Sequence, residues 1–166
     1  KVDSTGGAPI LNIFGGKITT YRKLAEDAME KIVPYFPGAS GHWTAEVPLP
    51  GGDFPVDGFD ALVSEVQLEH GFLTPFWARR LVRAYGTEAR DVLGDAKDKS
   101  DMGEDFGASL HAREVLWLIE NEYARCAEDI VWRRNKLGLR LSAEQIARLD
   151  DYVRKQVAPN GARAAE

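Results

Sequence analysis

The feature that most limits how this chain can fold is a concentration of proline and glycine between residues 34 and 58. Such a density interrupts helices and central strands, because proline lacks a backbone donor and glycine loses the most conformational freedom on ordering. The stretch contains Pro34, Pro37, Gly38, Gly41, Pro48, Pro50, Gly51, Gly52, Pro55 and Gly58. We therefore predict a linker at 37–57 between a first segment, 1–36, and a helical domain, 58–157, with a frayed tail at 158–166.

Before the linker, residues 10–14 form a short apolar run that predicts a β-strand, and two glycines follow it directly. Gly15 and Gly16 can take positive φ and carry no Cβ, so the chain can turn sharply while its amide groups lie against a ligand. Apolar residues then recur at helical spacing through residues 24–33, which predicts an amphipathic helix. This order of strand, turn and helix presents a helix N-terminus to a bound group.

The residues at this turn suit an anionic ligand. Thr19 or Thr20 is expected to cap the helix by accepting a hydrogen bond from a backbone amide, and Lys17 adds a positive charge beside the helix dipole. The simpler interpretation is an ordinary turn with a solvated lysine. The glycine spacing matches neither the P-loop nor the dinucleotide pattern, so the local sequence leaves the ligand open.

Five short motifs follow one another along the chain: residues 14–26 (FGGKITTYRKLAE), 49–52 (LPGG), 84–86 (AYG), 103–107 (GEDFG) and 127–138 (AEDIVWRRNKLG). In this order they resemble the C-terminal part of the FAD-dependent (aerobic, quinone-linked) glycerol-3-phosphate dehydrogenases. The motifs span almost the whole chain. Five ordered motifs arise by chance far less readily than one glycine pair.

The resemblance implies that residues 10–33 are the last strand, turn and helix of a large FAD-binding domain, and that a mostly helical C-terminal domain follows. The implied activity is hydride transfer from C2 of sn-glycerol 3-phosphate to FAD, which gives dihydroxyacetone phosphate, with the electrons passed to quinone. The resemblance places six cofactor-binding residues at the flavin ring, and Lys17 also at the substrate phosphate: Gly15, Gly16, Lys17, Ile18, Thr19 and Thr20.

On this interpretation the chain is a C-terminal fragment that is inactive alone, since it shows no dinucleotide fingerprint for the ADP half of FAD. Its partners are expected to be the upstream FAD-binding domain, glycerol 3-phosphate and quinone. The intact enzyme is expected in the cytoplasm, peripheral at the inner face of the cytoplasmic membrane, with its catalytic base outside these residues. The alternative is a helical module that binds a partner protein or a membrane surface and has no catalytic role.

Beyond the linker, helical periodicity predicts a compact bundle of about five helices, so the fold class is mainly α behind a strand-turn-helix remnant. Thr74 before Pro75 and the capping box of Ser142 with Gln145 mark two helix starts. Trp43 and Phe54 are expected to pin the linker by burying aromatic area. Five helices are expected at about residues 59–70, 74–86, 110–121, 128–138 and 142–157, with a short additional one at 88–93.

The charged residues give weaker signals. A net charge of −5 argues against a nucleic-acid binder. The basic run at 132–136 is interpreted as cations at a helix C-terminus, with a partner-binding patch as the alternative. Residues 95–109 are expected to be an acidic loop whose spacing lacks the calcium pattern, so we assign no metal. We also expect ion pairs between the two central helices, drawn from Glu114, Glu120, Glu122, Arg125, Asp129, Arg133 and Arg134.

The remaining reactive side chains are isolated from one another in the sequence. Cys126 is the single cysteine, so no internal disulfide is available, which is consistent with a reducing compartment. His42, His70 and His111 have no serine, cysteine or carboxylate at a diagnostic spacing, so we expect structural or solvated roles for all three. No run of apolar residues is long enough to span a bilayer.

Overall fold

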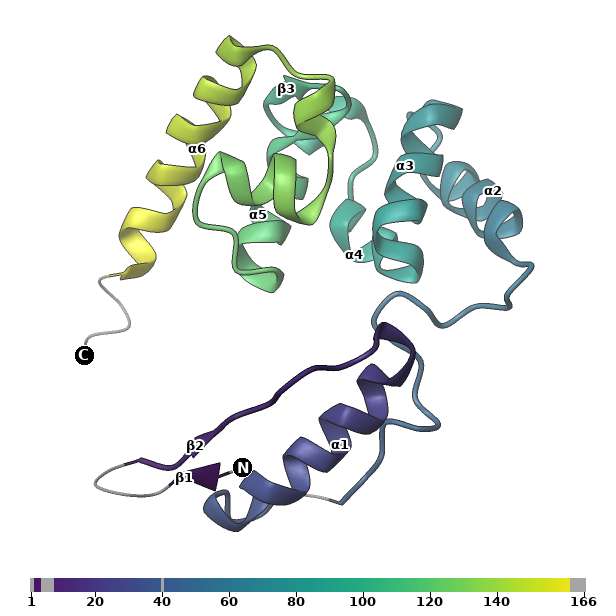
Figure 1. The fold of residues 1–166 in the computed structure, drawn as a ribbon. Helices are drawn as coiled ribbons and strands as arrows, with labels where there is room; N and C mark the ends of the chain where they lie inside the picture. Colours follow the sequence, from purple (N-terminus) through teal and green to yellow (C-terminus); the bar gives the residue numbers. More distant parts are fainter. Residues whose placement is uncertain (1, 4–7, 40, 162–166) are drawn as a thin grey trace. The chain divides into compact units, whose positions relative to one another are not determined.

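A computed structural model describes residues 2–3, 8–39 and 41–161 of the 166-residue chain. The described part is mainly helical, which confirms the predicted fold class (Figure 1). The chain divides into two compact units, Lys1–Pro48 and Leu49–Glu166, and the division falls inside the proline- and glycine-rich stretch. None of the helices in the described ranges combines the length and apolar character that a bilayer crossing requires.

The first unit is a small β-ribbon followed by one long helix. Strand β1 (Val2–Asp3) pairs antiparallel with β2 (Ile10–Leu11), which is shorter than the five residues that the sequence predicts. A 3₁₀ turn, Ile18–Thr20, leads into α1 (Tyr21–Ile32), and a second 3₁₀ turn that contains Pro34 ends it. The only side chain of α1 in the buried class is that of Glu26, and the apolar residues Leu24, Ala28 and Ile32 are only half-buried.

The second unit contains the hydrophobic core. Helices α2 (Phe59–Glu69) and α3 (Pro75–Tyr85) pack against each other, and the short α4 (Ala89–Leu93) follows. A β-hairpin of β3 (Asp105–Gly107) and β4 (Leu110–His111) precedes α5 (Ala112–Asn121), and α6 (Ala143–Gly161) packs on both (Figure 1). Helix α6 continues into the tail for which the sequence predicts fraying, and residues 162–166 lie outside the described residues.

Both predicted helix caps are confirmed. The Thr74 hydroxyl accepts a hydrogen bond from the Trp77 amide at 3.2 Å, with Pro75 in the first helical position. At the start of α6 the Gln145 amide donates to Ser142 Oγ at 3.3 Å, and the Ser142 amide donates to Gln145 Oε1 at 2.8 Å. These reciprocal bonds satisfy amides that the helix itself leaves without partners.

The prediction of an irregular loop at 95–109 is wrong in part. Asp98 accepts a hydrogen bond from the Ser100 amide at 2.7 Å, and Asp101 accepts one from the Asp98 amide at 3.2 Å, which closes a capping box on a 3₁₀ helix at Lys99–Met102. Asp105 lies 2.9 Å from Lys99 Nζ. The acidic side chains of this segment therefore bind nearby amides and a lysine, and the hairpin that follows was hidden by its polar composition.

The segment expected to be an α-helix at 128–138 is a π-helix at Asp129–Arg134, in which the Asn135 amide donates to the carbonyl of Ile130, five residues earlier. The expected ion-pair network between the central helices is also wrong. Arg133 pairs with Glu128 and Asp129 of its own segment, each at 3.2 Å. Arg134 donates to a backbone carbonyl, that of Glu122, at 3.0 Å.

Glu114 pairs instead with Arg80 of α3. The Arg80 Nη1 and Nη2 atoms lie 2.7 and 2.6 Å from the two carboxylate oxygens, and the Tyr85 hydroxyl donates to Oε1 at 2.7 Å. Arg80 Nε also donates to Ser109 Oγ at 2.8 Å, which ties the hairpin turn to the same group. Burial, together with the Glu114 charge, raises the pKa of Tyr85 well above its usual value, so the phenol stays protonated and remains a donor.

Two of the glycine motifs meet in the second unit. Gly51 and Gly86 both have positive φ, 73° and 56°, and the Thr87 amide donates to the Gly51 carbonyl at 3.0 Å. A Cβ on Gly86 would lie 1.8 Å from the Gly51 oxygen, closer than any side chain allows. The backbone of the 49–52 motif therefore packs directly against the backbone at the C-terminal end of α3.

Candidate functional site

The candidate site is the turn between β2 and α1. Gly15 and Gly16 have φ of 79° and 132°, which confirms the positive φ that the sequence suggested for this turn. Among the described residues, no atom lies within 4 Å of a Cβ built on Gly15, and a Cβ built on Gly16 would lie 3.1 Å from Leu24 Cδ2. Gly15 is therefore required for its backbone conformation in an open space, and a side chain there would project into whatever lies against the turn.

The helix end beside the glycines differs from the predicted cap. Thr20 occupies the N-cap position of α1 but accepts no capping bond, because its hydroxyl donates to the Lys17 carbonyl at 3.1 Å. The prediction that Thr19 or Thr20 caps this helix is therefore wrong: no side-chain cap is formed on α1 or on the 3₁₀ turn before it. The first turn of α1 also contains no acidic residue, so its dipole is not compensated there by a carboxylate.

The side chains of the turn face away from the unit's own interior. Phe14 and Ile18 are each 88% exposed, and Lys17, Thr19 and Thr20 are exposed as well. A hollow of about 240 Å³ beside the turn is lined by residues of β2, the turn and α1, Phe14 and Leu24 among them, but Lys17 is not part of it. Residues 15–20 thus form one contiguous exposed segment.

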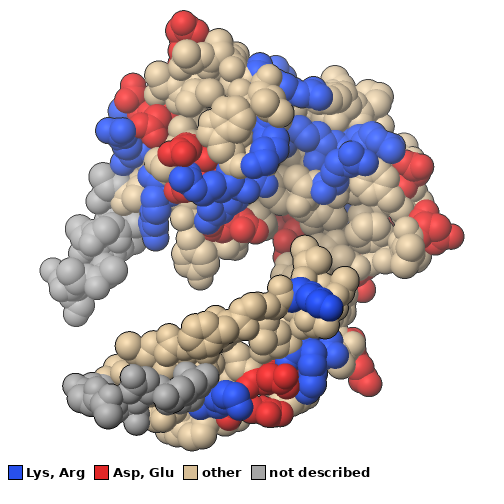
Figure 2. Space-filling view, viewed as in Figure 1, with Lys and Arg blue, Asp and Glu red and all other residues tan. Residues whose placement is uncertain are grey.

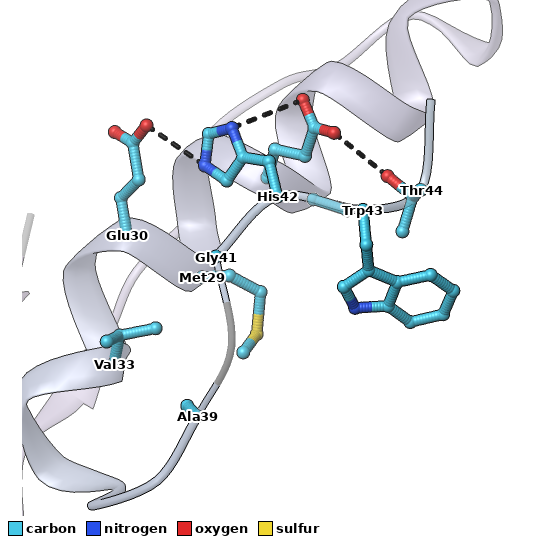
Figure 3. A pocket seen from close by; sticks show the side chains of 10 residues that line it. Met29, Glu30, Val33, Ala39, Gly41, His42, Trp43 and Thr44 are labelled. Carbon is cyan, nitrogen blue, oxygen red and sulfur yellow. Dashed lines mark hydrogen bonds and ion pairs between the residues drawn. The ribbon is translucent and has the colours of Figure 1, made fainter. Parts of the chain in front are cut away.

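A second group of polar residues lies further along α1, and no pattern in the sequence indicated it. Glu26 is 8% exposed and accepts hydrogen bonds from Thr44 Oγ1 at 2.9 Å and Arg22 Nη1 at 2.5 Å. Figure 3 shows His42 between two carboxylates, with its Nε2 atom 3.1 Å from Glu30 Oε1 and its Nδ1 atom 3.8 Å from Glu26 Oε2. The Thr44 hydrogen bond, helped by the Arg22 charge, lowers the pKa of Glu26 despite its burial.

These polar residues line a pocket of about 340 Å³, together with Met29, Val33 and Trp43 (Figure 3). Trp43 remains 60% exposed, so the prediction that it is buried is wrong, whereas Phe54 packs against the core of the second unit as expected. Glu26 and His42 hold residues 41–44 against α1. We interpret the group as the anchor of the connecting segment, because its polar atoms are already paired with one another.

The other two histidines are core residues. His70 is buried, with its Nδ1 atom 3.0 Å from the Ala96 carbonyl oxygen. His111 is 1% exposed and its ring stacks on Trp77 with 4.4 Å between centroids. Burial lowers the pKa of His111, an effect that the Asp105 carboxylate opposes only in part.

The architecture defines the class: a compact helical domain preceded in the chain by a short β-ribbon, a glycine turn and one amphipathic helix. A sequence profile described as the C-terminal domain of alpha-glycerophosphate oxidase matches residues 42–158, and the chain belongs to this family. The resemblance stated from the five motifs is therefore confirmed, and the AYG, GEDFG and AEDIVWRRNKLG motifs fall inside the matched range.

Three full-length relatives extend the comparison. The chain is 43% identical over 151 residues to the aerobic glycerol-3-phosphate dehydrogenase of Escherichia coli and to a glycerol-3-phosphate dehydrogenase of Pseudomonas aeruginosa. It is 38% identical over 146 residues to the D-erythritol 1-phosphate dehydrogenase of Brucella abortus. These matches cover 91%, 91% and 88% of this chain but only 30%, 29% and 29% of the relatives.

The length of the first two matches also shows that they include most of the turn. A match of 151 residues in a chain of 166 cannot begin after residue 16, so it includes Lys17, Ile18, Thr19 and Thr20. At least residues 16–48 of the first unit are thus homologous to part of these enzymes, although the family profile begins only at residue 42. The chain spans about 30% of the length of these curated relatives.

Proposed function

We propose that this chain is the C-terminal part of an FAD-dependent dehydrogenase that oxidises sn-glycerol 3-phosphate to dihydroxyacetone phosphate and passes the electrons to quinone. The observation that carries the proposal is the 43% identity to two glycerol-3-phosphate dehydrogenases across a match that includes the exposed turn. In this assignment an upstream FAD-binding domain supplies the remainder of the cofactor site, and the chain on its own is inactive.

The residues of the turn fit a flavin. Gly15 leaves open space where a Cβ would stand, the helix start lacks both a capping side chain and an acidic residue, and Phe14 and Ile18 offer exposed apolar surface. An aromatic ring system with an electron-rich edge requires such a combination of flat access, apolar contact and positive potential. When bound, FAD supplies the acceptor for the hydride from C2 of the substrate.

The turn residues themselves bind and orient. Gly15, Gly16, Ile18, Thr19 and Thr20 lie against the ring in the proposal, and their amides and hydroxyls hydrogen-bond its polar edge. The ammonium group of Lys17 stabilises negative charge at that edge or on the substrate phosphate, since preorganised positive groups lower the energy of charge that develops in the transition state. No residue of this chain is proposed as the catalytic base.

The substrate class is a phosphorylated polyol in either branch of the relatives. One relative acts on D-erythritol 1-phosphate by its name, and it is only slightly less similar to this chain than the glycerol-3-phosphate enzymes. Initial rates with both substrates on the intact enzyme decide between them. The proposed location is the cytoplasm, with the intact enzyme peripheral at the inner face of the membrane where quinone is available.

The experiment that tests the proposal is Lys17→Ala in the intact enzyme. We expect turnover to fall, or the KM for glycerol 3-phosphate to rise, by about tenfold or more, which corresponds to about 1.4 kcal/mol of lost transition-state binding. Lys97→Ala is the matched control, because Lys97 is an exposed lysine of the second unit that does not line the hollow beside the turn. Partial recovery in Lys17→Arg would indicate that the charge matters; unchanged kinetics in Lys17→Ala would remove this residue from the site.

A further inference from the structure

The second unit carries a basic pocket that the proposed function does not use. It lies between α3 and the residues that follow the π-helix, and has a volume of about 460 Å³. Phe76 and Leu137 contribute apolar surface. Six cationic side chains line it: Arg79, Arg80, Arg83, Arg134, Lys136 and Arg140. Figure 2 shows Lys and Arg side chains gathered in a band on the face of this unit that carries α3.

Two of the six charges are neutralised by the protein itself. Arg80 forms the bidentate pair with the buried Glu114 described above, and Arg79 Nη1 lies 2.7 Å from Asp60 Oδ1. Burial alone would lower the pKa of Arg80, but the Glu114 carboxylate outweighs it and the pKa is raised, so this guanidinium stays charged. Both arginines are committed to carboxylates and form one side of the pocket.

The other four cations have no carboxylate partner among the residues that the structure describes. Arg134 and Lys136 donate to backbone carbonyls, those of Glu122 and Trp132, which fix their positions but leave their charges. The guanidinium carbon of Arg140 lies 5.0 Å from the centre of the Phe76 ring, and that of Arg83 lies 6.0 Å from the Phe59 ring.

The concentration of these charges is notable because the whole chain is acidic, with a net charge of −5 and many carboxylates that could have paired with them. Like charges gathered around one hollow repel each other and raise the local concentration of anions. The Lys136 bond to Trp132 agrees with the helix C-terminus interpretation of the 132–136 run, but it does not explain why Arg83 and Arg140 converge on the same hollow.

The geometry points to phosphate as the group that fills the pocket: we propose that it binds a phosphate-bearing ligand through Arg83, Arg134, Lys136 and Arg140. Guanidinium groups bind phosphate oxygens with two parallel hydrogen bonds, and several of them around one hollow favour a group with more than one negative charge. Asn135 also lines the pocket, and its buried amide nitrogen has no acceptor among the residues that the structure describes. Phe76 and Leu137 can contact an apolar portion of the ligand.

Two sources supply this chemistry, a soluble phosphate compound and the headgroup of an anionic phospholipid. The probes are inorganic pyrophosphate, titrated by calorimetry, and phosphatidylcholine vesicles with or without phosphatidylglycerol, tested by co-sedimentation. Both are applied to the intact protein. The pocket variant is Arg83→Gln, Arg134→Gln and Arg140→Gln together. The control is Lys97→Gln, Arg154→Gln and Lys155→Gln, which removes the same charge from exposed side chains that do not line the pocket.

We expect the unmodified protein and the control to bind one of the probes, and the pocket variant to bind it at least about tenfold more weakly. Loss of pyrophosphate binding assigns the pocket to a soluble phosphate compound, and loss of binding to phosphatidylglycerol vesicles assigns it to a lipid headgroup. The proposal is overturned if neither probe binds, or if the pocket and control variants lose binding equally.

A second variant guards against a folding defect. Arg83→Gln with Arg140→Gln leaves the carbonyl bonds of Arg134 and Lys136 in place. The two guanidinium groups that it removes stack on rings and form no hydrogen bond or ion pair with the described residues. Its melting temperature should match that of the unmodified protein, and its binding should again be weaker than that of the control. A folded double variant with unchanged binding would also overturn the proposal.

Discussion

The two units of the chain use the same kind of amphipathic sequence in opposite ways. In the second unit, α3 buries Trp77, Ala78, Leu81 and Val82 in a shared core. In the first, α1 has a comparable apolar stripe, yet its one buried side chain is the carboxylate of Glu26, and the apolar side chains are at most half-buried. An apolar stripe on a helix is stabilising only when something covers it.

The exposed residues of the first unit show where that cover is missing. Ile10, Ile13, Phe14 and Ile18 are all more than half exposed, and they lie on the strand and turn that precede α1. The second unit contains a closed core, whereas the first presents its apolar residues on one edge. The difference suits a first unit that completes a larger domain and a second unit that folds around its own centre.

The motif glycines divide in the same way. Gly51 and Gly86 let two backbones of the second unit touch, so their role is internal packing. Gly15 has no neighbour that a Cβ would meet, so its role is conformation and access. Motifs that look alike in the sequence therefore serve folding in one unit and an open surface in the other.

The largest effect that would test this comparison is the loss of Glu114. We expect Glu114→Ala to lower the free energy of unfolding by roughly 3 to 5 kcal/mol, because Arg80 would keep a buried charge without a partner. Glu65→Ala is the control, since Glu65 pairs with Arg90 on the surface at 3.1 Å and should cost less than about 1 kcal/mol. Urea unfolding followed by tryptophan fluorescence measures both. Similar losses in the two variants would mean that the second unit does not depend on its buried ion pair.

A smaller effect separates the two glycine pairs. Gly86→Ala should destabilise the second unit by about 3 kcal/mol, because its Cβ would overlap the Gly51 carbonyl in a backbone conformation that alanine avoids. Gly15→Ala should cost only about 1 kcal/mol, since it meets a conformational penalty and no atom. In the intact enzyme, however, we expect the main effect of Gly15→Ala to be a lower turnover, with the protein still folded. Equal thermal shifts for the two variants would contradict the division of roles.

The smallest expected effect is a pH dependence that belongs to the second unit. Since burial lowers the pKa of His111, the folded state binds a proton less readily than the unfolded chain, whose histidine titrates near about 6.5. The contribution of His111 to stability is therefore complete above about pH 6.5 and is lost as the pH falls toward its folded pKa. The charged groups that face it are Asp105, Lys99 and Glu114, and the lowered pKa of Asp105 keeps that carboxylate ionised across this range.

Melting temperatures measured between about pH 7.5 and pH 5 test this point. The unmodified chain should lose stability across the interval, and His111→Asn should show a flatter profile even if it is less stable throughout. Carboxylates with lowered pKa values, such as Asp129, act at lower pH and do not account for the loss. An equal slope in the His111→Asn variant would show that this histidine is not the titrating group.

Much of the fold could be predicted because local signals and tertiary packing agree. The caps at Thr74 and Ser142 are where the sequence places them, and the apolar spacing of α2, α3 and α5 matches their buried faces. The prediction failed where a short-range pattern was ambiguous. The hairpin turn places Ala108 and Ser109 at φ of 50° and 65°, which neither residue type favours, and contacts such as the Arg80 bond to Ser109 hold it.

The candidate turn shows the same limit. Its glycines predicted a bend with positive φ. The direction of the Thr20 hydroxyl, however, depends on the 3₁₀ turn that precedes α1. Partners far apart in the sequence were also beyond reach. Nothing in the spacing of Glu26 and His42, or of Arg80 and Glu114, indicates that they pair, because ion pairs between distant segments depend on how the backbone brings those segments together.

By itself, the sequence determined the mainly helical class, the division near the proline- and glycine-rich stretch and the family, because periodicity, backbone chemistry and ordered motifs are written in the local order of residues. Tertiary structure alone decided which apolar faces are covered, which glycines are in direct backbone contact and which cations have no carboxylate partner among the described residues. Those properties depend on distances between residues that are remote along the chain, and only the folded backbone sets them.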